Sequence, residues 1–419
     1  MTASGANGPD RWRRDFPILA RELDGRPLVY LDSAATSLKP QAVLDAERRY
    51  ATDLGANIHR SQHRLGEDTS LAYEEARATV AHFLGTRPSC LVFTRNTTES
   101  LNLVAHGLGL TPADRVLVPH LGEHHSNLLP WMQRATLVDA GLDPMQPIDP
   151  QELALAIERH QPRVVAFGAA SHVTGIVQPI AEVCALAREH GVLSVVDAAQ
   201  LAPHAPLEVD ASGCDFVAAS GHKMLGPTGI GVLAGREDAL EQLAPLLWGG
   251  GMVDRVARDA VRLKGLPGRL EAGTPNIAGA LGLAAACEYV ERCGWASIAE
   301  HERSLAFLLR SALEAVPGVR VLGDAAATRV PIATVVFETD DVTPFMAERL
   351  LSDAHNVMVR AGFHCAHPFF DERGFTSGGL RASAHLYTTA DDITRFASAL
   401  AELLARLGAR TRASREERG

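Results

Sequence analysis

The sequence lacks several features that mark membrane, secreted and nucleic-acid-binding proteins. No apolar run reaches the roughly 18 residues that a membrane-spanning helix needs. Residues 1–10 are small and polar, without the apolar stretch of a secretory signal. The formal net charge of −10 argues against a surface that binds nucleic acid. We therefore expect a cytoplasmic protein that binds neither membranes nor nucleic acids.

Cysteine is also scarce. The chain has six cysteines, and no two of them have the CxxC spacing. Scattered cysteines in a large cytoplasmic chain are usually reduced and buried, and we expect this of all except Cys365. The adjacent histidines His124 and His125 have no third ligand at a metal-like spacing, so we expect no metal site.

The composition is that of an ordinary soluble enzyme. The chain has 419 residues, of which 46% are hydrophobic and 21% charged, and it is long enough for two domains. We expect a large domain over residues 16–289, whose first residues pack on a smaller domain over residues 290–407. Residues 1–15 and 408–419 are expected to be flexible ends.

Short apolar runs alternate with amphipathic stretches in the larger part. This alternation predicts parallel strands joined by helices in a doubly wound α/β sheet. The predicted strands are residues 90–94, 115–118, 164–170, 192–196 and 215–220, and the predicted helices include 70–84, 97–106, 150–160, 180–190 and 277–293. After about residue 290 the pattern predicts a smaller α+β unit that ends in a helix over 389–407.

Polar residues follow two of these strands. One run ends on Asp197, and the other ends on Ser220-Gly-His-Lys223. Ligands of open α/β sheets lie beyond the carboxyl ends of the strands, so Asp197, Gln200, Ser220, His222 and Lys223 should share one rim. Pyridoxal phosphate (PLP) needs an amine for a Schiff base, a carboxylate for its ring nitrogen and donors for its phosphate. These residues offer all three.

Two other stretches of the large domain could serve the same cofactor. Thr97 and Thr98 lie on a strand-to-helix turn, where hydroxyls and free N–H groups can bind an anion; an ordinary helix cap is the alternative. His124 is better suited to stack on a flat ring than to bind a metal. The non-periodic stretch 57–65, which contains Arg60, is either a solvated loop or a lid over the site.

The segment VRAGFHCAHP contains the exceptional cysteine. Cys365 follows a predicted strand and lies beside His364, and an exposed thiol with a basic neighbour can act as a nucleophile. A buried structural cysteine is the alternative. Arg381 is a natural two-point partner for a substrate carboxylate, with a surface ion pair as its alternative.

Taken together, the motifs LDSAA, TTES, EHHSN, VDAAQ, SGHKMLGPTGIG, EAGTPN and RAGFHCA resemble the class V aminotransferases of PLP fold-type I. They are most similar to the cysteine desulfurases of the SufS type, over nearly the whole chain. The resemblance implies a large domain with a mainly parallel sheet of the seven-stranded type and a smaller α+β C-terminal domain. It also implies PLP as the cofactor, L-cysteine as the substrate and a cytoplasmic sulfur-acceptor protein as the partner. The sulfur would serve iron–sulfur cluster assembly, a cofactor or a secondary metabolite.

The resemblance also implies roles for individual residues. Lys223 would bond to PLP, Asp197 would pair with its ring nitrogen, Gln200 with its phenolic oxygen, and His124 would stack on the ring as part of the catalytic set. The phosphate would be held by Thr98, Ser220 and His222, joined by Thr274 from the other subunit of a homodimer with shared active sites. Arg381 and Arg360 would bind substrate, and Cys365 would take the sulfur as a persulfide.

One position departs from the family pattern. His172 stands where the family normally has Asn beside the cofactor and the substrate carboxylate. If its imidazole titrates near its usual pKa, the KM for substrate should worsen as pH rises. The alternative is that His172 only packs beside the cofactor ring and has no effect on the pH dependence. Other PLP enzymes on this scaffold remain alternatives: a C–S lyase, a selenocysteine lyase acting on selenocysteine, an epimerase or an aminotransferase. A non-catalytic sulfur-relay protein is a further alternative.

Overall fold

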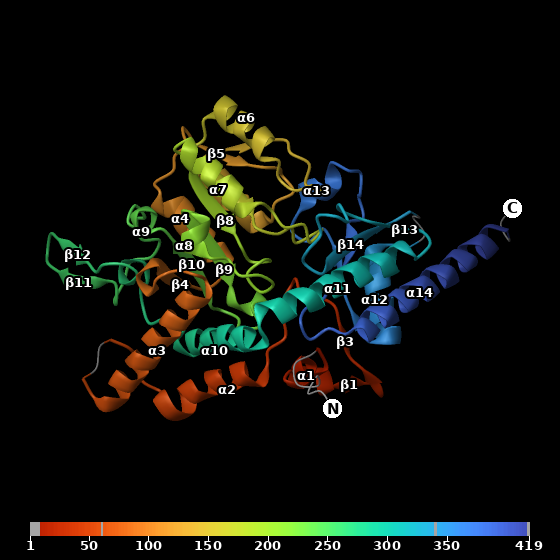
Figure 1. Cartoon of the computed structure of the whole chain (residues 1–419), viewed down its shortest axis with the longest axis horizontal. Coiled ribbons are helices and arrows are strands. Elements are labelled where there is room, and N and C mark those ends of the chain that lie inside the picture. The colour runs from red at the N-terminus through yellow and green to blue at the C-terminus, as the bar shows by residue number, and fades with distance from the viewer. Residues whose placement is uncertain (1–8, 60–61, 339–341, 417–419) are drawn as a thin grey trace.

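The computed structural model describes residues 9–59, 62–338 and 342–416. Its centre is a seven-stranded sheet with the order β4-β10-β9-β8-β7-β5-β6 (Figure 1). Strands β5 to β9 pair in parallel, and β10 runs antiparallel to its neighbours β4 and β9. The predicted mainly parallel α/β sheet is confirmed. Its strands are β4 (Leu91–Thr94), β5 (Arg115–Val118), β6 (Thr136–Asp139), β7 (Val164–Gly168), β8 (Leu193–Asp197), β9 (Phe216–Ser220) and β10 (Gly231–Gly235).

Both faces of this sheet are buried, which explains why its inner strands are continuous apolar runs. Alternate residues, such as Val195 and Val196, belong to hydrophobic clusters on opposite faces. The cluster that contains Val196 includes residues of α3 (Arg64–Phe83), α6 (Pro150–His160), α7 (Ile180–Glu189) and α10 (Ile277–Cys293). The cluster that contains Val195 includes residues of α4 (Thr97–Gly107), α5 (Leu129–Arg134) and α9 (Glu237–Leu240). Helix α2 (Gln41–Arg49) packs against α10.

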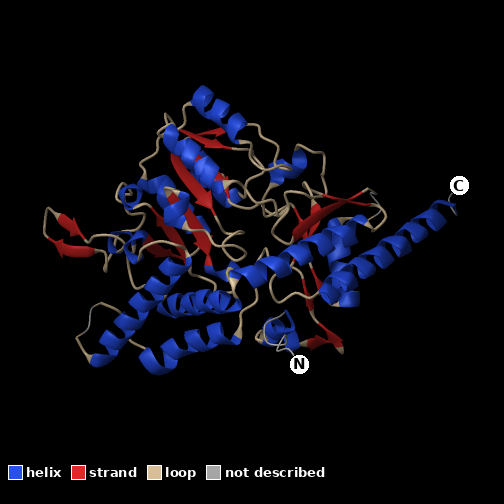
Figure 2. Cartoon of the chain, in the orientation of Figure 1, coloured by secondary structure: helices blue, strands red, loops and turns tan. Residues whose placement is uncertain are grey.

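A second, smaller sheet lies beside the first (Figure 2). It is antiparallel, with the order β13-β14-β17-β16, and packs on three helices around its own hydrophobic core. Its elements are β13 (Val319–Val321), β14 (Ile332–Phe337), β16 (Arg360–Gly362), β17 (Gly379–Ser383), α11 (Trp295–Glu314), α12 (Pro344–His355) and α14 (Ala390–Glu416). Near the N-terminus, β3 (Val29–Tyr30) pairs in parallel with β15 (Val357–Met358), and Val29 and Leu31 enter this core. The start of the chain is thereby joined to its last third.

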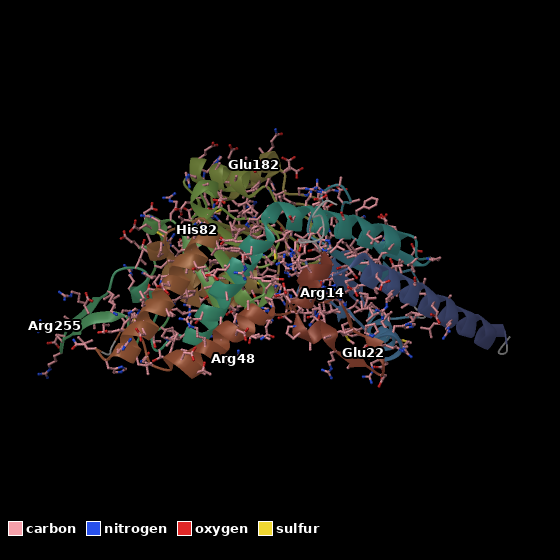
Figure 3. All side chains as sticks on the ribbon, turned by 60° about the horizontal axis from the view of Figure 1, so that its bottom comes forward. Arg14, Glu22, Arg48, His82, Glu182 and Arg255 are labelled. Atoms are coloured by element: carbon pink, nitrogen blue, oxygen red, sulfur yellow. The ribbon has the colours of Figure 1, made fainter. Side chains whose placement is uncertain are left out.

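A hairpin of β11 (Val253–Val256) and β12 (Val261–Leu263) extends from the end of the molecule opposite the small sheet (Figure 1). Arg255 lies on the outer surface of this hairpin (Figure 3). Among the described residues, every helix is either too short or too polar to span a bilayer. The remaining short elements are α1 (Pro9–Arg14), η1 (Pro17–Ala20), β1 (Glu22–Leu23), β2 (Arg26–Pro27), η2 (Tyr50–Leu54), η3 (Pro88–Cys90), η4 (His125–Asn127), α8 (Val209–Ser212), η5 (Gly221–Lys223), η6 (Gly268–Leu270) and α13 (His367–Asp371).

The ends of several elements differ from the prediction. The N-terminal segment predicted to be flexible through residue 15 contains α1, where Trp12 is buried and Arg13 forms an ion pair with Asp392, 2.8 Å apart. Helix α3 begins at Arg64 rather than near residue 70, because the His63 ring accepts the N–H of Gly66 and caps it. Helix α14 continues past residue 407 to Glu416, into the segment predicted to be flexible. Arg60 lies outside the described residues.

Candidate active site

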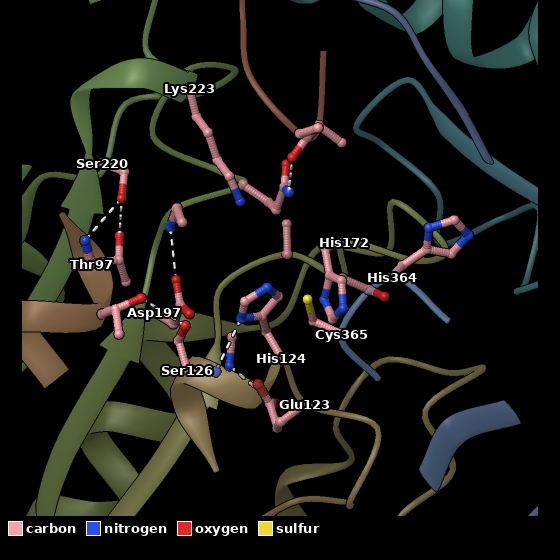
Figure 4. A pocket seen from close by; sticks show the side chains of 18 of the residues that line it. Thr97, Glu123, His124, Ser126, His172, Asp197, Ser220, Lys223, His364 and Cys365 are labelled. Atoms are coloured by element: carbon pink, nitrogen blue, oxygen red, sulfur yellow. Dashed lines mark hydrogen bonds between the residues drawn. The ribbon is translucent and has the colours of Figure 1, made fainter. Parts of the chain in front are cut away.

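The predicted site residues of the large sheet converge on one cavity of about 350 Å³ (Figure 4). The turns after β8 and β9, the N-terminus of α4, the segments 120–126 and 168–172, and the small-sheet segment from Arg360 to Arg381 all contribute to its wall. The predicted residues on the cavity are Thr97, Thr98, His124, His172, Asp197, Gln200, Ser220, His222, Lys223, Arg360, Cys365 and Arg381. The arrangement therefore joins residues of both sheets around one space.

Lys223 and Asp197 come from neighbouring parallel strands. Asp197 is the last residue of β8, and Lys223 ends η5, which directly follows β9. Burial lowers the pKa of Lys223 to about 8, although the nearby Asp197 opposes this shift. Burial raises the pKa of Asp197, whose Oδ1 accepts the N–H of Ala199 at 3.0 Å. The pair provides an amine that is easily deprotonated and a buried carboxylate that needs a positive partner.

The N-terminus of α4 forms a polar pocket at another part of the cavity. The N–H and hydroxyl of Thr97 lie 2.8 and 2.7 Å from Ser220 Oγ, and Thr98 Oγ1 lies 2.8 Å from Ser126 Oγ. Asn96 caps the helix by accepting the N–H of Glu99. A helix N-terminus with hydroxyls around it favours an anion such as phosphate. His222 also lines this cavity, and burial lowers its pKa to about 4.

Two histidines face each other in the cavity. The rings of His124 and His172 are edge to face, with centroids 4.9 Å apart. His124 Nδ1 accepts the N–H of Ser126 at 3.1 Å, which leaves its proton on Nε2. Burial lowers the pKa of His124 to about 3 and that of His172 well below its usual range. Burial therefore favours the neutral form of His172 and opposes the expectation that this residue titrates near pH 6.5.

Glu123 also lines the cavity, although no sequence motif predicts a role for it. Its Oε1 accepts the N–H of Gly168 and its Oε2 accepts from the side chain of Asn127, each at 3.0 Å. Burial raises the pKa of Glu123 to about 7, and the negative charge of Asp197 contributes in the same direction. Its position next to His124 in the chain was visible in the sequence, but its burial depends on the packing of β7 against this segment.

Asp32 organises the two arginines of the site. Its carboxylate binds Arg360 through Nε and Nη2, and its Oδ1 lies 3.7 Å from Arg381 Nη2. Arg381 is buried and donates from Nη1 to the carbonyl of His172 at 2.9 Å, while its Nε has no partner. The unsatisfied N–H of Arg381 points to an anionic ligand, because a buried donor without an acceptor is costly.

Cys365 lies in a strained loop. His364 and Cys365 have φ values of 47° and 60°, a left-handed conformation that is costly outside glycine. The N–H of His125 donates to the carbonyl of Cys365 at 2.9 Å, which helps to hold the loop. The thiol is exposed, whereas the adjacent His364 ring is buried and neither of its nitrogens has a partner. Burial lowers the pKa of His364 to about 2, so it brings no positive charge to the thiol.

Thr274 is the predicted site residue that lies elsewhere. It lines a separate cavity of about 650 Å³, where the side chain of Asn57 donates to its Oγ1 at 3.4 Å. Gln200 does reach the first cavity, and its amide donates to the carbonyl of Ala34 at 2.8 Å. Thr274 therefore does not line the cavity of its own chain that contains Lys223.

The residues of the first cavity fit PLP. The amine of Lys223, the carboxylate of Asp197 and the donors at the start of α4 match the three polar functions of the cofactor. The cavity wall also contains buried polar atoms without partners, namely His120 Nδ1, His172 Nε2, both His364 nitrogens and Arg381 Nε. Such atoms are expected around a site that is completed by a polar ligand.

Comparison with known proteins agrees with this chemistry. The family model described as Aminotransferase class-V matches residues 29–396. A probable cysteine desulfurase of Pseudomonas aeruginosa is 42% identical over 400 residues, which cover 94% of this chain and 97% of that protein. A probable cysteine desulfurase of Halalkalibacterium halodurans is 40% identical over 394 residues, covering 92% of this chain and 95% of the relative.

Solved structures give the same result. The apo structure of a cysteine desulfurase from Thermococcus onnurineus NA1 has a TM-score of 0.88 at 35% identity, covering 96% of this chain and 99% of the other. The cysteine desulfurase CsdA of Escherichia coli, solved in an S-sulfonic acid form, has a TM-score of 0.85 at 36% identity over the same shares of the two chains.

Proposed function

The chain belongs to the class-V aminotransferase family, and we propose that Lys223 holds its PLP and that Cys365 receives sulfur from the substrate. The protein is a PLP-dependent cysteine desulfurase, which converts L-cysteine to L-alanine. The observation that carries the proposed roles is that the exposed thiol of Cys365 shares one cavity with Lys223 and Asp197. A lyase or an aminotransferase on the same scaffold would not need a thiol there.

The residues described above would hold the cofactor. Lys223 would supply the amine for the covalent bond, Asp197 would pair with the ring nitrogen, His124 would stack on the ring and Gln200 would bind the phenolic oxygen. Thr98, Ser220 and His222 would bind the phosphate, while Thr97 orients Ser220 through two hydrogen bonds. When bound, PLP supplies an electron sink that makes the Cα–H of an attached amino acid acidic.

Arg381 binds and orients the substrate carboxylate. Its buried guanidinium has an unpartnered Nε, and its pKa is lowered to about 10 by burial, so a carboxylate offers it both a hydrogen bond and a compensating charge. Arg360 lies at the more exposed side of the cavity and is already paired with Asp32. His172 binds beside the substrate as a neutral imidazole, with Nε2 free to form one hydrogen bond.

Lys223 moves the substrate proton. The lowered pKa of its amine, about 8, allows a substantial neutral fraction near neutral pH, as a general base requires. The same amine returns the proton after the carbon–sulfur bond breaks. His124 is neutral and presents Nε2–H, so it donates a hydrogen bond in the cavity without adding charge.

Cys365 completes the reaction as the nucleophile. Its thiolate attacks the sulfur of L-cysteine, a sulfur–sulfur bond forms, and the Cβ–S bond of the substrate breaks. The electron pair of the broken bond stays with Cβ, which takes up a proton equivalent to the one that the Cys365 thiol released. The products are L-alanine and a persulfide on Cys365, so no external oxidant or reductant is needed. The strained loop and the contact of its carbonyl with His125 hold the thiol on the cavity while leaving it exposed to an acceptor.

We also propose the finer assignments that the sequence motifs suggest. The RAGFHCA segment supports the SufS type, and Thr274 supports a homodimer in which each chain completes its partner's phosphate site. Its location on a separate cavity of its own chain is compatible with this role. A cytoplasmic sulfur-acceptor protein and iron–sulfur cluster assembly are the proposed setting.

Turnover with L-cysteine tests the proposed function. The purified PLP-loaded protein should release alanine in the presence of a thiol reductant, and Cys365→Ala should lose this activity while keeping its PLP absorbance. Undiminished alanine release by Cys365→Ala would reject the persulfide mechanism. In that case the protein would be a lyase that does not use the thiol.

A further inference from the structure

The side chains of two histidines and one glutamate lie together in the interior of the protein, outside the cavity described above. His204, Glu302 and His385 each offer a ligand atom, and these atoms all lie within 4.8 Å of one another. Among the residues that the structure describes, this is the only such group of three. The side chains are 7%, 4% and 1% exposed, respectively.

Each member comes from a different part of the fold. His204 follows β8 in the large sheet, Glu302 is in α11, and His385 follows β17 of the small sheet. His204 and Glu302 are 98 positions apart, so no spacing along the sequence indicates the cluster. The expectation of no metal site relied on such spacing.

The carboxylate of Glu302 bridges the two imidazoles. Its Oε2 lies 2.8 Å from His204 Nδ1, and its Oε1 lies 3.5 Å from His385 Nδ1. Oε1 has no hydrogen-bond partner. No arginine or lysine forms an ion pair with Glu302 among the described residues. A buried carboxylate in this setting lacks a compensating positive charge, which is unfavourable.

We propose that His204, Glu302 and His385 form a structural binding site for one divalent transition metal, with zinc as the best match. Two imidazoles and a carboxylate are typical zinc ligands, with bonds of about 2.0–2.2 Å. Ligand atoms around such an ion lie about 3.3–3.6 Å apart by tetrahedral geometry. The two imidazole nitrogens lie 2.8 and 3.5 Å from different oxygens of Glu302, and all the ligand atoms lie within 4.8 Å of one another, so the side chains must shift to share one ion.

Metal binding replaces two local contacts, of which the first is the hydrogen bond between His204 Nδ1 and Glu302 Oε2. His385 Nδ1 now accepts the N–H of Leu386 at 2.8 Å, and a metal ion on this nitrogen takes the same lone pair. The ring of Tyr387 stacks on His385, with centroids 5.3 Å apart, and closes one side of the cluster.

The proposed metal site would join three parts of the chain near the active site, namely the segment after β8, helix α11 and the segment after β17. The His385 ring lies next to the backbone of Lys223, and His385 is close in sequence to Arg381. A metal ion bound by these ligands would fix α11 and the end of β17 against the large sheet. It would stabilise the relative positions of Lys223 and Arg381 without touching the substrate.

Zinc content tests the proposal directly. The PLP-loaded protein is prepared with Cys365→Ser, because the exposed thiol could itself bind zinc, then incubated with zinc chloride and separated from weakly bound metal on a chelating column. Elemental analysis should find about one zinc ion per chain. Glu302→Gln and His385→Gln in the same background should lose most of it, and zinc should raise the Tm of the parent by a few degrees but not that of either variant.

His301→Gln is the matched control. His301 precedes Glu302 in the same helix, but its ring contacts the carbonyl of Thr388 and is not a proposed ligand. This control should retain the zinc of the parent. The proposal is overturned if the parent holds no zinc, which would mean that Glu302 is balanced by a proton. It is equally overturned if Glu302→Gln and His385→Gln hold as much zinc as the parent.

Discussion

Asp32 and Arg360 form a two-point ion pair at the cavity, with Arg360 Nε 3.1 and 3.2 Å from the two carboxylate oxygens and Nη2 2.9 Å from Oδ2. The carboxylate of Asp32 therefore already balances the positive charge of Arg360. Arg381 differs, because it is buried and its Nε lacks a partner. The two arginines that the sequence assigned alike to substrate binding are therefore not equivalent.

Arg381→Lys should raise the KM for L-cysteine by about tenfold or more. A lysine keeps the positive charge but cannot form the two parallel hydrogen bonds of a guanidinium, and a hydrogen bond to a charged group contributes about 1.5–3 kcal/mol. Steady-state kinetics would measure the change. Arg360→Lys should have a smaller effect on KM, since its partner Asp32 remains available. An equal or larger effect of Arg360→Lys on KM would mean that Arg360, and not Arg381, binds the substrate carboxylate.

Lys223 should bond to the cofactor with an unusual pH dependence. Only the neutral amine can form the bond, and the pKa of Lys223 is lowered to about 8 by burial. The rate of covalent PLP binding by the apoprotein should rise up to about pH 8 and then level off, whereas an unshifted lysine would continue to gain up to its ordinary value of 10.5. Lys223→Ala should yield no adduct after borohydride reduction. An adduct in this variant would place the linkage on another lysine.

His172 should not act as a pH switch. Its burial keeps the imidazole neutral, because the pKa lies well below the ordinary value of 6.5. KM measured between about pH 6 and 9 should therefore follow the same profile in the wild type and in His172→Asn, even if the absolute values differ. A wild-type KM that worsens as pH rises through about 6.5, together with a flat profile in the variant, would show that His172 titrates in the working range.

Glu123 should make the apoprotein less stable as pH rises. Its pKa is raised from 4.5 to about 7 by burial, so between these values the folded protein holds a proton that the unfolded chain has released. Stability is then lost as pH increases through this window. Glu123→Gln cannot ionise and should gain about 3 kcal/mol relative to the wild type on going from pH 4.5 to 7. Glu302, whose pKa is also raised to about 7, is present in both proteins and cancels.

Denaturant unfolding of both apoproteins at several pH values would measure this difference. A constant difference across the window would mean that Glu123 ionises at its ordinary pKa in the folded state. The hydrogen bonds from Gly168 and Asn127 would then outweigh its burial.

Local patterns were sufficient to predict much of this fold and site. Asp197 and Lys223 could be placed together because β8 and β9 are apolar runs whose parallel pairing puts their carboxyl ends at one edge. The pairing of Asp32 with Arg360 could not be predicted, because β3 and β15 bring together parts of the chain that are far apart in sequence. The same holds for the burial of Glu123 and for the cluster of His204, Glu302 and His385. The capping of α3 by His63 and the burial of Trp12 likewise depend on contacts that propensity alone does not reveal.

The transfer of sulfur to Cys365 is the central claim, and mass spectrometry of the protein after a single turnover tests it most directly. The PLP-loaded wild type is mixed with a limiting amount of L-cysteine without a thiol reductant, alkylated and digested. We predict that the peptide containing Cys365 gains one sulfur atom in proportion to the alanine released, and that a thiol reductant removes it. Release of alanine with no added sulfur on Cys365, or with the sulfur on another cysteine, would contradict the account.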